Sequence, residues 1–221
     1  MTSTYTIIDI SQPVSSRTAC FPGDTPFSRQ VTLRMEEGAT VNLTSFTMSP
    51  HVGTHADAPS HIQGRMDADE GMASGMPLLP YIGPCAVLDV CPLAGGITRE
   101  HFEKAASRLK ELPPRVVFKT QKKLRFDVWE GSVYSHFTVE LVEAMKSRGI
   151  IMAGLDTPSV DHIDSKDLQV HHAMIKAGFS WLENLDLTNA EEGIYFLSAA
   201  PLKLTELEAS PVRAVLIKDL I

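Results

Sequence analysis

The sequence predicts an α/β domain with some antiparallel pairing near the amino terminus, because short apolar runs of strand length alternate with amphipathic helical stretches. Five apolar runs predict strands, at residues 86–90, 115–119, 150–155, 194–197 and 212–217. The 221 residues contain neither an internal repeat nor a shift in composition that would mark a linker. We therefore expect a single domain over residues 1–221, which is long enough to bury a core without disulfide bonds.

Three stretches between these runs predict helices. The first starts after Thr98, whose side chain can cap it, and has to end at the prolines at positions 113 and 114. The second covers residues 138–148, and the third starts near residues 164–165 and ends at Gly178. Residues 64–77, rich in Gly, Met and Asp, predict one long functional or covering loop.

The composition argues against several classes of partner. There are 20 Lys and Arg against 27 Asp and Glu, which gives a formal net charge of −7, and the densest basic stretch is only residues 122–125. We therefore expect no nucleic-acid partner. The apolar runs fall far short of the ~18 residues of a membrane span, so we expect no membrane partner either.

The amino terminus lacks the basic and apolar regions of a secretion signal. The three cysteines, Cys20, Cys85 and Cys91, are an odd number without CxxC spacing, so they should serve packing more than metal binding. Together these features predict a cytoplasmic protein.

The most informative segment is residues 51–61, which contains His51, His55, Asp57 and His61. Imidazole and carboxylate side chains are the ligands of catalytic zinc and manganese sites. All four groups occupy odd-numbered positions, so an extended segment would point them to one side, whereas Gly53 and a following proline disfavour a helix. The segment is not a zincin motif, because Val follows His51 where HExxH requires Glu.

A second signal lies in residues 179–187, where alternation predicts that Phe179, Trp181, Leu185 and Leu187 share one face with Glu183. A carboxylate among large apolar side chains needs a cation, a metal ion or a raised pKa. A salt bridge to a basic residue and a metal-ligand role are both compatible with this pattern. Upstream, His171 and His172 lie on the third predicted helix, and because adjacent helical side chains diverge by ~100°, at most one of them should join Glu183.

The sequence thus offers six candidate ligand groups for a mononuclear or dinuclear metal site: His51, His55, Asp57, His61, one of His171 and His172, and Glu183. The sequence contains no GxSxG elbow, no P-loop and no GxGxxG after a strand, so no motif indicates a serine hydrolase, an NTPase or a dinucleotide-binding enzyme.

The segment from His51 to His61 resembles the HxGTHxDxPxH signature of the cyclase-like metal hydrolases, and within them the chain most resembles the bacterial kynurenine formamidases (arylformamidases). Further matching stretches run almost from end to end, at residues 8–13, 22–26, 81–84, 156–159, 164–166, 171–173, 182–183 and 210–215. The resemblance implies a swivelling β/β/α-type domain with a mixed sheet, a homodimer or larger homo-oligomer, and two divalent metal ions per chain, usually zinc, with manganese as the alternative.

Carried over residue by residue, the resemblance implies roles for each group. His51, His55 and Asp57 would hold one metal, and Asp57, His171 and Glu183 the other, so that Asp57 bridges the two. His61 would be the proton donor and acceptor. The substrate would be N-formyl-L-kynurenine, hydrolysed to L-kynurenine and formate in tryptophan degradation.

One position departs from the formamidase pattern. These enzymes usually carry a substrate-binding Trp just before the Pro-Gly-Asp-Thr-Pro stretch, where this chain has Phe21. Phenylalanine keeps an aromatic face but loses an N–H donor. Phe21 is thus a candidate substrate-binding residue or a packing residue near a turn. Two alternatives stay open: a related hydrolase of another amide, an isatin-like cyclic amide or a lactone, and a metal-binding protein without catalysis.

Overall fold

A mixed sheet forms the centre of the computed structural model, which describes residues 5–64, 71–129 and 134–220. In the described part of the chain it has nine strands in the order β1-β13-β11-β5-β7-β9-β10-β4-β12. The four central strands are parallel to one another: β5 (Ile82–Asp89), β7 (Arg115–Lys119), β9 (Met152–Leu155) and β10 (Ser180–Glu183). This confirms the α/β class with a mixed sheet.

Antiparallel strands extend the sheet on both sides. One side carries β11 (Gly193–Ser198), β13 (Val215–Lys218) and β1 (Thr6–Asp9), and the other carries β4 (His55–Asp57) and β12 (Ala209–Pro211). All five predicted strands are present, although the last begins at residue 215 instead of 212. Strands from both ends of the described chain belong to this one sheet, and the boundaries 1–221 of the domain stay a prediction.

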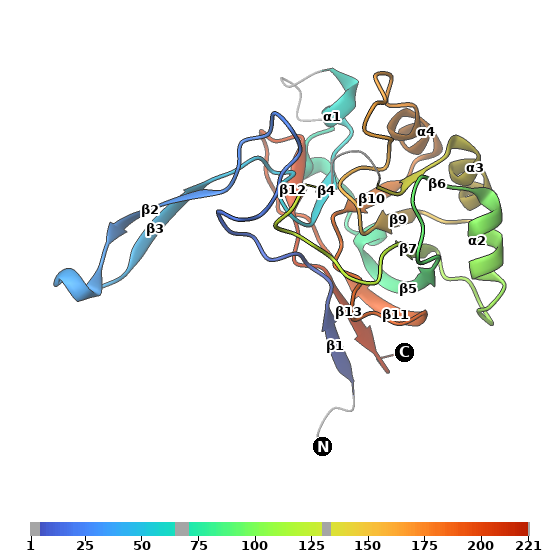
Figure 1. Cartoon of the computed structure of the whole chain (residues 1–221), viewed down its shortest axis with the longest axis horizontal. Coiled ribbons are helices and arrows are strands. Elements are labelled where there is room, and N and C mark those ends of the chain that lie inside the picture. The colour runs from blue at the N-terminus through green and yellow to red at the C-terminus, as the bar shows by residue number, and fades with distance from the viewer. Residues whose placement is uncertain (1–4, 65–70, 130–133, 221) are drawn as a thin grey trace.

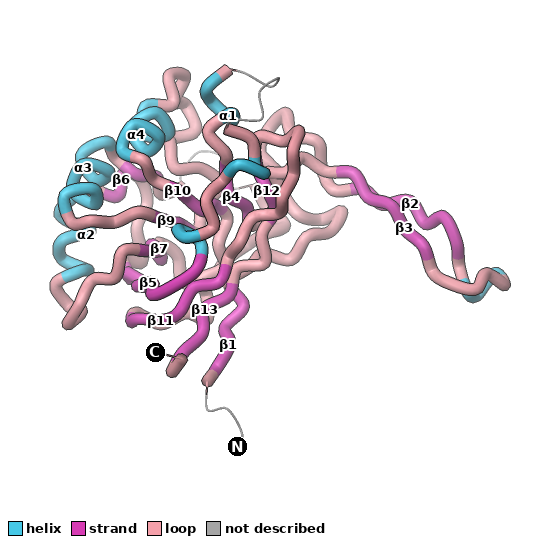
Figure 2. The backbone as a smooth tube through the Cα atoms, turned by 180° about the vertical axis from the view of Figure 1, so that it is seen from behind, coloured by secondary structure: helices cyan, strands magenta, loops and turns pink. Residues whose placement is uncertain are grey.

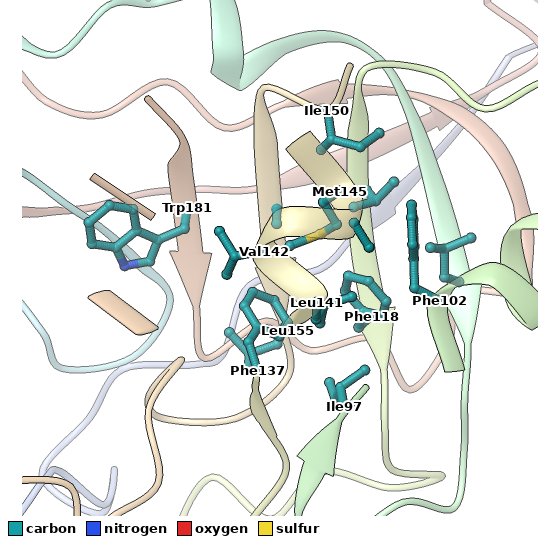
Figure 3. Packing of buried hydrophobic residues seen from close by; sticks show 14 of the residues in the cluster. Ile97, Phe102, Phe118, Phe137, Leu141, Val142, Met145, Ile150, Leu155 and Trp181 are labelled. Carbon is teal, nitrogen blue, oxygen red and sulfur yellow. The ribbon is translucent and has the colours of Figure 1, made fainter. Parts of the chain in front are cut away.

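Three helices lie together on one face of the sheet: α2 (Arg99–Ala106), α3 (Val139–Ser147) and α4 (Gln169–Ala177) (Figures 1 and 2). Beneath them, Phe118 of β7 packs against Phe137, at 5.3 Å between ring centroids, and against Phe102, at 6.2 Å (Figure 3). Short elements complete the chain: α1 (Ser60–Gln63), the 3-10 turns Met35–Glu37, Ala73–Gly75 and Leu79–Tyr81, and the small pair β6 (Gly96–Ile97) and β8 (His136–Phe137).

Two of the predicted helix limits are wrong. Thr98 caps α2 as expected, but the helix ends at Ala106, well before the prolines. The third helix starts at Gln169, not near residues 164–165, because Leu168 has a left-handed φ of 44° and the Asp161 carboxylate accepts the first free N–H groups of the helix. Its predicted end at Gly178 is confirmed.

The predicted common face of residues 179–187 is also wrong. Phe179 and Trp181 pack under the helices, whereas Leu185 and Leu187 belong to the apolar cluster on the opposite side of the sheet. Asn184 has a left-handed φ of 57° directly after β10, which ends the alternation at Glu183.

A two-stranded arm projects from the body on the side opposite the helices (Figures 1 and 2). The arm, residues 28–47, pairs β2 (Ser28–Leu33) with β3 (Leu43–Thr47), and only Val31 and Ala39 in it are even partly buried. Its exposed side chains include the large apolar residues Leu33, Met35, Val41, Leu43 and Phe46.

The predicted loop at residues 64–77 lies partly outside the described residues. In its described part, Met72, Ala73 and Met76 are buried, so this part packs against the body. Across the described ranges, no helix combines the length and the apolarity that crossing a bilayer requires.

Candidate metal centre

The segment from His51 to His61 turns before and after a very short strand. β4 comprises only His55–Asp57, and His51 lies in the turn before it, which agrees with the expectation of an extended or loop segment. His61 lies on the short helix α1, so that expectation is wrong at this residue. Gly53 makes the turn before β4: its φ is +73°, and a Cβ there would lie 2.7 Å from Val14 Cγ2. A glycine is required at this point on both counts.

The sheet brings the second half of the site to the first. β4 pairs with β10 in a register that places Glu183 opposite His55, and α4 carries His171 to the same place. His171 is buried and His172 is exposed, so a single histidine of the pair reaches the site, as the helical spacing predicts.

Six predicted groups converge in space. His51 Nδ1 lies 3.0 Å and His55 Nε2 3.2 Å from Asp57 Oδ1, and His171 Nε2 lies 3.5 Å from Asp57 Oδ2. Glu183 approaches His55 Nε2 at 3.4 Å and His171 Nε2 at 3.7 Å. The ring of His61 lies 4.4 Å from that of His51, centroid to centroid. His55, Asp57, His171 and Glu183 are all buried, and Asp57 lies at the centre.

The carboxylates dominate the electrostatics of the metal-free cluster. Burial lowers the pKa of the histidines, but the close carboxylates of Asp57 and its neighbours outweigh it and raise the pKa of His51 to about 9 and those of His55 and His171 to about 10. Burial also opposes ionisation of Asp57, yet the three histidines hold its pKa well below the usual range. Such a cluster retains positive charge at neutral pH, which a divalent cation can replace.

His61 behaves differently. Although part of its ring is exposed, burial by the surrounding side chains lowers its pKa, and Asp57 opposes this only in part. A neutral imidazole is therefore available at the mouth of the site at neutral pH.

Outer groups fix the orientation of the inner ones. His55 Nδ1 lies 2.9 Å from the carbonyl oxygen of Gly53, and His171 Nδ1 lies 2.7 Å from Asp161 Oδ2, so that each Nε2 faces the cluster. The indole N–H of Trp181 donates to Asp57 Oδ2 at 3.1 Å. These are the outer contacts that metal-binding histidines and carboxylates characteristically make.

The donor set fits a metal ion. His55 Nε2 and Asp57 Oδ1 are buried without a hydrogen-bond partner in the described residues, although they lie only 3.2 Å apart. Leaving such atoms unpaired is costly in a protein interior. A cation between them would satisfy both, and imidazole with carboxylate is a suitable set for zinc or manganese.

The ligand atoms fall into two sets, His51 with Asp57 and His61, and His55 with Asp57 and Glu183, each with all its atoms within 4.8 Å of one another. Asp57 belongs to both, as a bridging role requires. The grouping of histidines differs from the one that the resemblance implied, and it brings His61 within reach of a metal. The role of each residue therefore stays a prediction.

A cavity of about 620 Å³ opens above the cluster and is lined by His51, His55, His61, His171 and Glu183. Phe21 also lines it, with its ring 5.1 Å from that of Trp129 in an edge-to-face arrangement. The cavity thus joins the candidate metal centre to an aromatic wall.

Two contributing residues, Asp161 and Glu208, escaped the sequence analysis, and so did the role of Trp181 as a hydrogen-bond donor. Glu208 Oε1 lies 3.4 Å from His51 Nε2. Trp181 was predicted only as an apolar neighbour of Glu183. Asp161 contacts His171 and Glu208 contacts His51, but no sequence spacing links either pair. Only the tertiary arrangement reveals these contacts.

Comparison with known proteins agrees with this arrangement. A family model described as a putative cyclase matches residues 8–162. The chain belongs to the cyclase family. Among curated members, it is 39% identical to the kynurenine formamidase of Bordetella petrii over 208 residues, which cover 94% of this chain and 96% of that protein. It is 39% identical to the kynurenine formamidase of Paracidovorax citrulli over 217 residues, 98% of each chain.

Two solved structures of this fold are more distant in sequence. Isatin hydrolase A from Ralstonia solanacearum superposes with a TM-score of 0.81 at 22% identity, covering 96% of this chain and 92% of that one. A predicted metal-dependent hydrolase from Bacillus stearothermophilus gives 0.75 at 22% identity, covering 97% and 99%. These similarities establish that the cyclase fold extends over nearly the whole chain.

Proposed function

We propose that this cyclase-family chain is a metal-dependent formamidase that hydrolyses N-formyl-L-kynurenine to L-kynurenine and formate. The observation that carries the proposal is near-full-length identity of about 40% to kynurenine formamidases, in a chain whose buried His, Asp and Glu side chains meet at the floor of a cavity.

We propose that His51, His55, Asp57, His171 and Glu183 hold two divalent cations, zinc in preference to manganese. Held there, the cations would lower the pKa of a bound water and polarise the formyl carbonyl. Trp181 keeps the Asp57 carboxylate in place, and Asp161 keeps His171 in the tautomer whose Nε2 can bind metal.

In the proposed reaction the water oxygen adds to the formyl carbon and the C–N bond breaks. The departing aryl nitrogen needs a proton, because an anilide anion is too basic to leave. His61 is the proposed donor: its ring is at the cavity wall, neutral at neutral pH, and able to take a proton from the water and pass it to nitrogen. The remaining proton leaves with formic acid, which ionises to formate.

The proposed substrate-binding residue is Phe21, which with Trp129 offers two aromatic surfaces to an aryl ring. A cyclic amide or lactone, as in the isatin hydrolases of the same fold, is the second candidate, because Phe21 replaces the Trp of the formamidase pattern. Phe21→Trp should raise kcat/KM for N-formyl-L-kynurenine relative to isatin if this position sets the choice between them.

We also propose a homodimer in a cytoplasmic setting. The arm supports the dimer, because an isolated two-stranded ribbon is only marginally stable and exposed apolar patches commonly mark interfaces. Light scattering should give twice the chain mass for the wild type. Phe46→Ser should shift it towards the monomer, while Gln30→Ser, a polar position on the same arm, should not.

The test of the function is formate release from N-formyl-L-kynurenine by purified protein, by chelator-treated protein, and by the latter after addition of zinc or manganese. Turnover that is lost with the metal and restored by it supports the proposal. A protein that binds two metals per chain but leaves this substrate intact would exclude formamidase activity. If isatin and a panel of amides and lactones also remained intact, the chain would be a metal-binding protein without catalysis.

A further inference from the structure

The densest basic stretch of this acidic chain, residues 122–125, lies at the candidate site. Lys122 and Arg125 line the cavity above the metal centre, together with His55 and Glu183, whereas their neighbour Lys123 is not among its lining residues. Nothing in the proposed hydrolysis uses the positively charged side chains of Lys122 and Arg125.

Asp156, the residue after β9, holds the start of the loop that carries Lys122 and Arg125. Its carboxylate accepts hydrogen bonds from the Thr120 N–H at 2.9 Å, the Thr120 hydroxyl at 2.6 Å and the Gln121 N–H at 3.2 Å. The Gln121 side chain donates in turn to the Asp156 carbonyl at 2.6 Å. The start of the loop is therefore fixed to the sheet.

The far end of the loop is attached as well. The Leu124 N–H donates to the Thr188 hydroxyl at 3.2 Å, and the Ala19 N–H donates to the Phe126 carbonyl at 2.8 Å. Figure 1 shows this segment, in yellow-green, running towards the blue segment that precedes β2. Lys122 and Arg125 thus lie on a loop of the cavity wall that hydrogen bonds hold at both ends.

The same loop continues to Trp129, whose ring packs edge-to-face against Phe21, and both residues line the cavity. The wall therefore offers an aryl-binding surface and, a few residues away on the same loop, two positive charges. The other ionisable groups around the cavity include Asp24, Asp156 and Glu183, which would repel an anion.

We propose that Lys122 and Arg125 form a carboxylate-binding subsite, which selects aryl amides that carry a carboxylate on a short aliphatic side chain. Arg125 is the principal contact, because a guanidinium binds a carboxylate through two parallel hydrogen bonds. Lys122 adds a charge that attracts the anion. The inference rests on the proposed function and deepens it, since N-formyl-L-kynurenine has an aryl formamide at one end and a carboxylate at the other.

The test compares two substrates and three variants. Arg125→Gln should raise KM for N-formyl-L-kynurenine about 10-fold with little change in kcat, because a charge-assisted contact is lost at a partly solvated site. Lys122→Gln should have a smaller effect of the same kind. Neither should alter hydrolysis of formanilide, which lacks the carboxylate, and Lys123→Gln is the matched control for net charge.

An equal loss on both substrates, or no loss on either, would overturn the subsite. Binding of 3-benzoylpropionate, an aryl ketone with a carboxylate, measured by calorimetry, separates this failure from that of the proposed function. If the wild type binds it and Arg125→Gln binds it about 10-fold more weakly, the subsite stands even when N-formyl-L-kynurenine is not hydrolysed. Equal affinity in both proteins, or none in the wild type, refutes it.

Discussion

Asp161 offers the sharpest test of how the site is held together. Its buried carboxylate accepts the Val170 N–H at 3.1 Å, the His171 N–H at 2.9 Å and a bond from His171 Nδ1 at 2.7 Å. Burial disfavours its charge, yet the bonds from His171 and the backbone hold the pKa of Asp161 below its usual range. One carboxylate thus caps α4 and orients a candidate metal ligand.

Asp161→Ala removes both acceptor oxygens, so the Val170 N–H, the His171 N–H and His171 Nδ1 all lose their partner. Loss of a helix cap costs about 0.5–2 kcal/mol, so the free energy of unfolding of the metal-free protein should fall by about 1–2 kcal/mol. Loss of the bond to His171 should weaken metal binding by about 10–100-fold.

Urea unfolding followed by circular dichroism in the presence of a chelator measures the first effect, and competition with a chromophoric chelator for zinc measures the second. Asp164→Ala is the matched control, because the Asp164 side chain lies in the same loop and is 88% exposed. A variant at position 161 that binds zinc within twofold of the wild type, or a control that weakens binding equally, would refute the reasoning.

Three further predictions concern other parts of the molecule. His61→Ala should lower kcat by about 10²–10⁴-fold with metal content intact, by elemental analysis; a loss of metal would instead make His61 a ligand. In the metal-free protein the raised pKa values of His55 and His171 stabilise the fold fully below pH ~6.5, and this stabilisation disappears as the pH rises through about 10. Its Tm should therefore fall from neutral to pH 10, whereas a zinc-loaded sample should not show this fall; a flat metal-free profile would contradict the shifts. Phe118→Ala should cost about 3–5 kcal/mol of unfolding free energy because its ring fills the core beneath the helices, and a loss under 1 kcal/mol in urea titrations would show that the core collapses around it.

The sequence predicts best what is local. His51, His55 and Asp57 lie within one short segment, so their common chemistry is visible without the fold, and the strand at residues 115–119 has the predicted bounds. The start of α4 was missed, because the group that caps it is Asp161, which is eight residues upstream of the helix and not adjacent to it.

The break at Asn184 was missed for a different reason. A positive φ in a non-glycine residue leaves no mark on the apolar pattern, so the alternation of residues 179–187 continued in the prediction where the strand had ended. Glu208 and Trp181 contribute through contacts that only the sheet order creates.

The pairing of β4 with β10 has a consequence for the order of folding. The hydrogen bond from Trp181 to Asp57 joins residues 124 positions apart, and that from Thr54 to Asn184 joins residues 130 apart. Contacts at such separation form slowly, and on the ribosome β4 has to wait until β10 has been synthesised. The two halves of the metal centre therefore meet only after most of the sheet is built. If a cation binds only at that stage, it should leave the rate of refolding unchanged and lower the rate of unfolding.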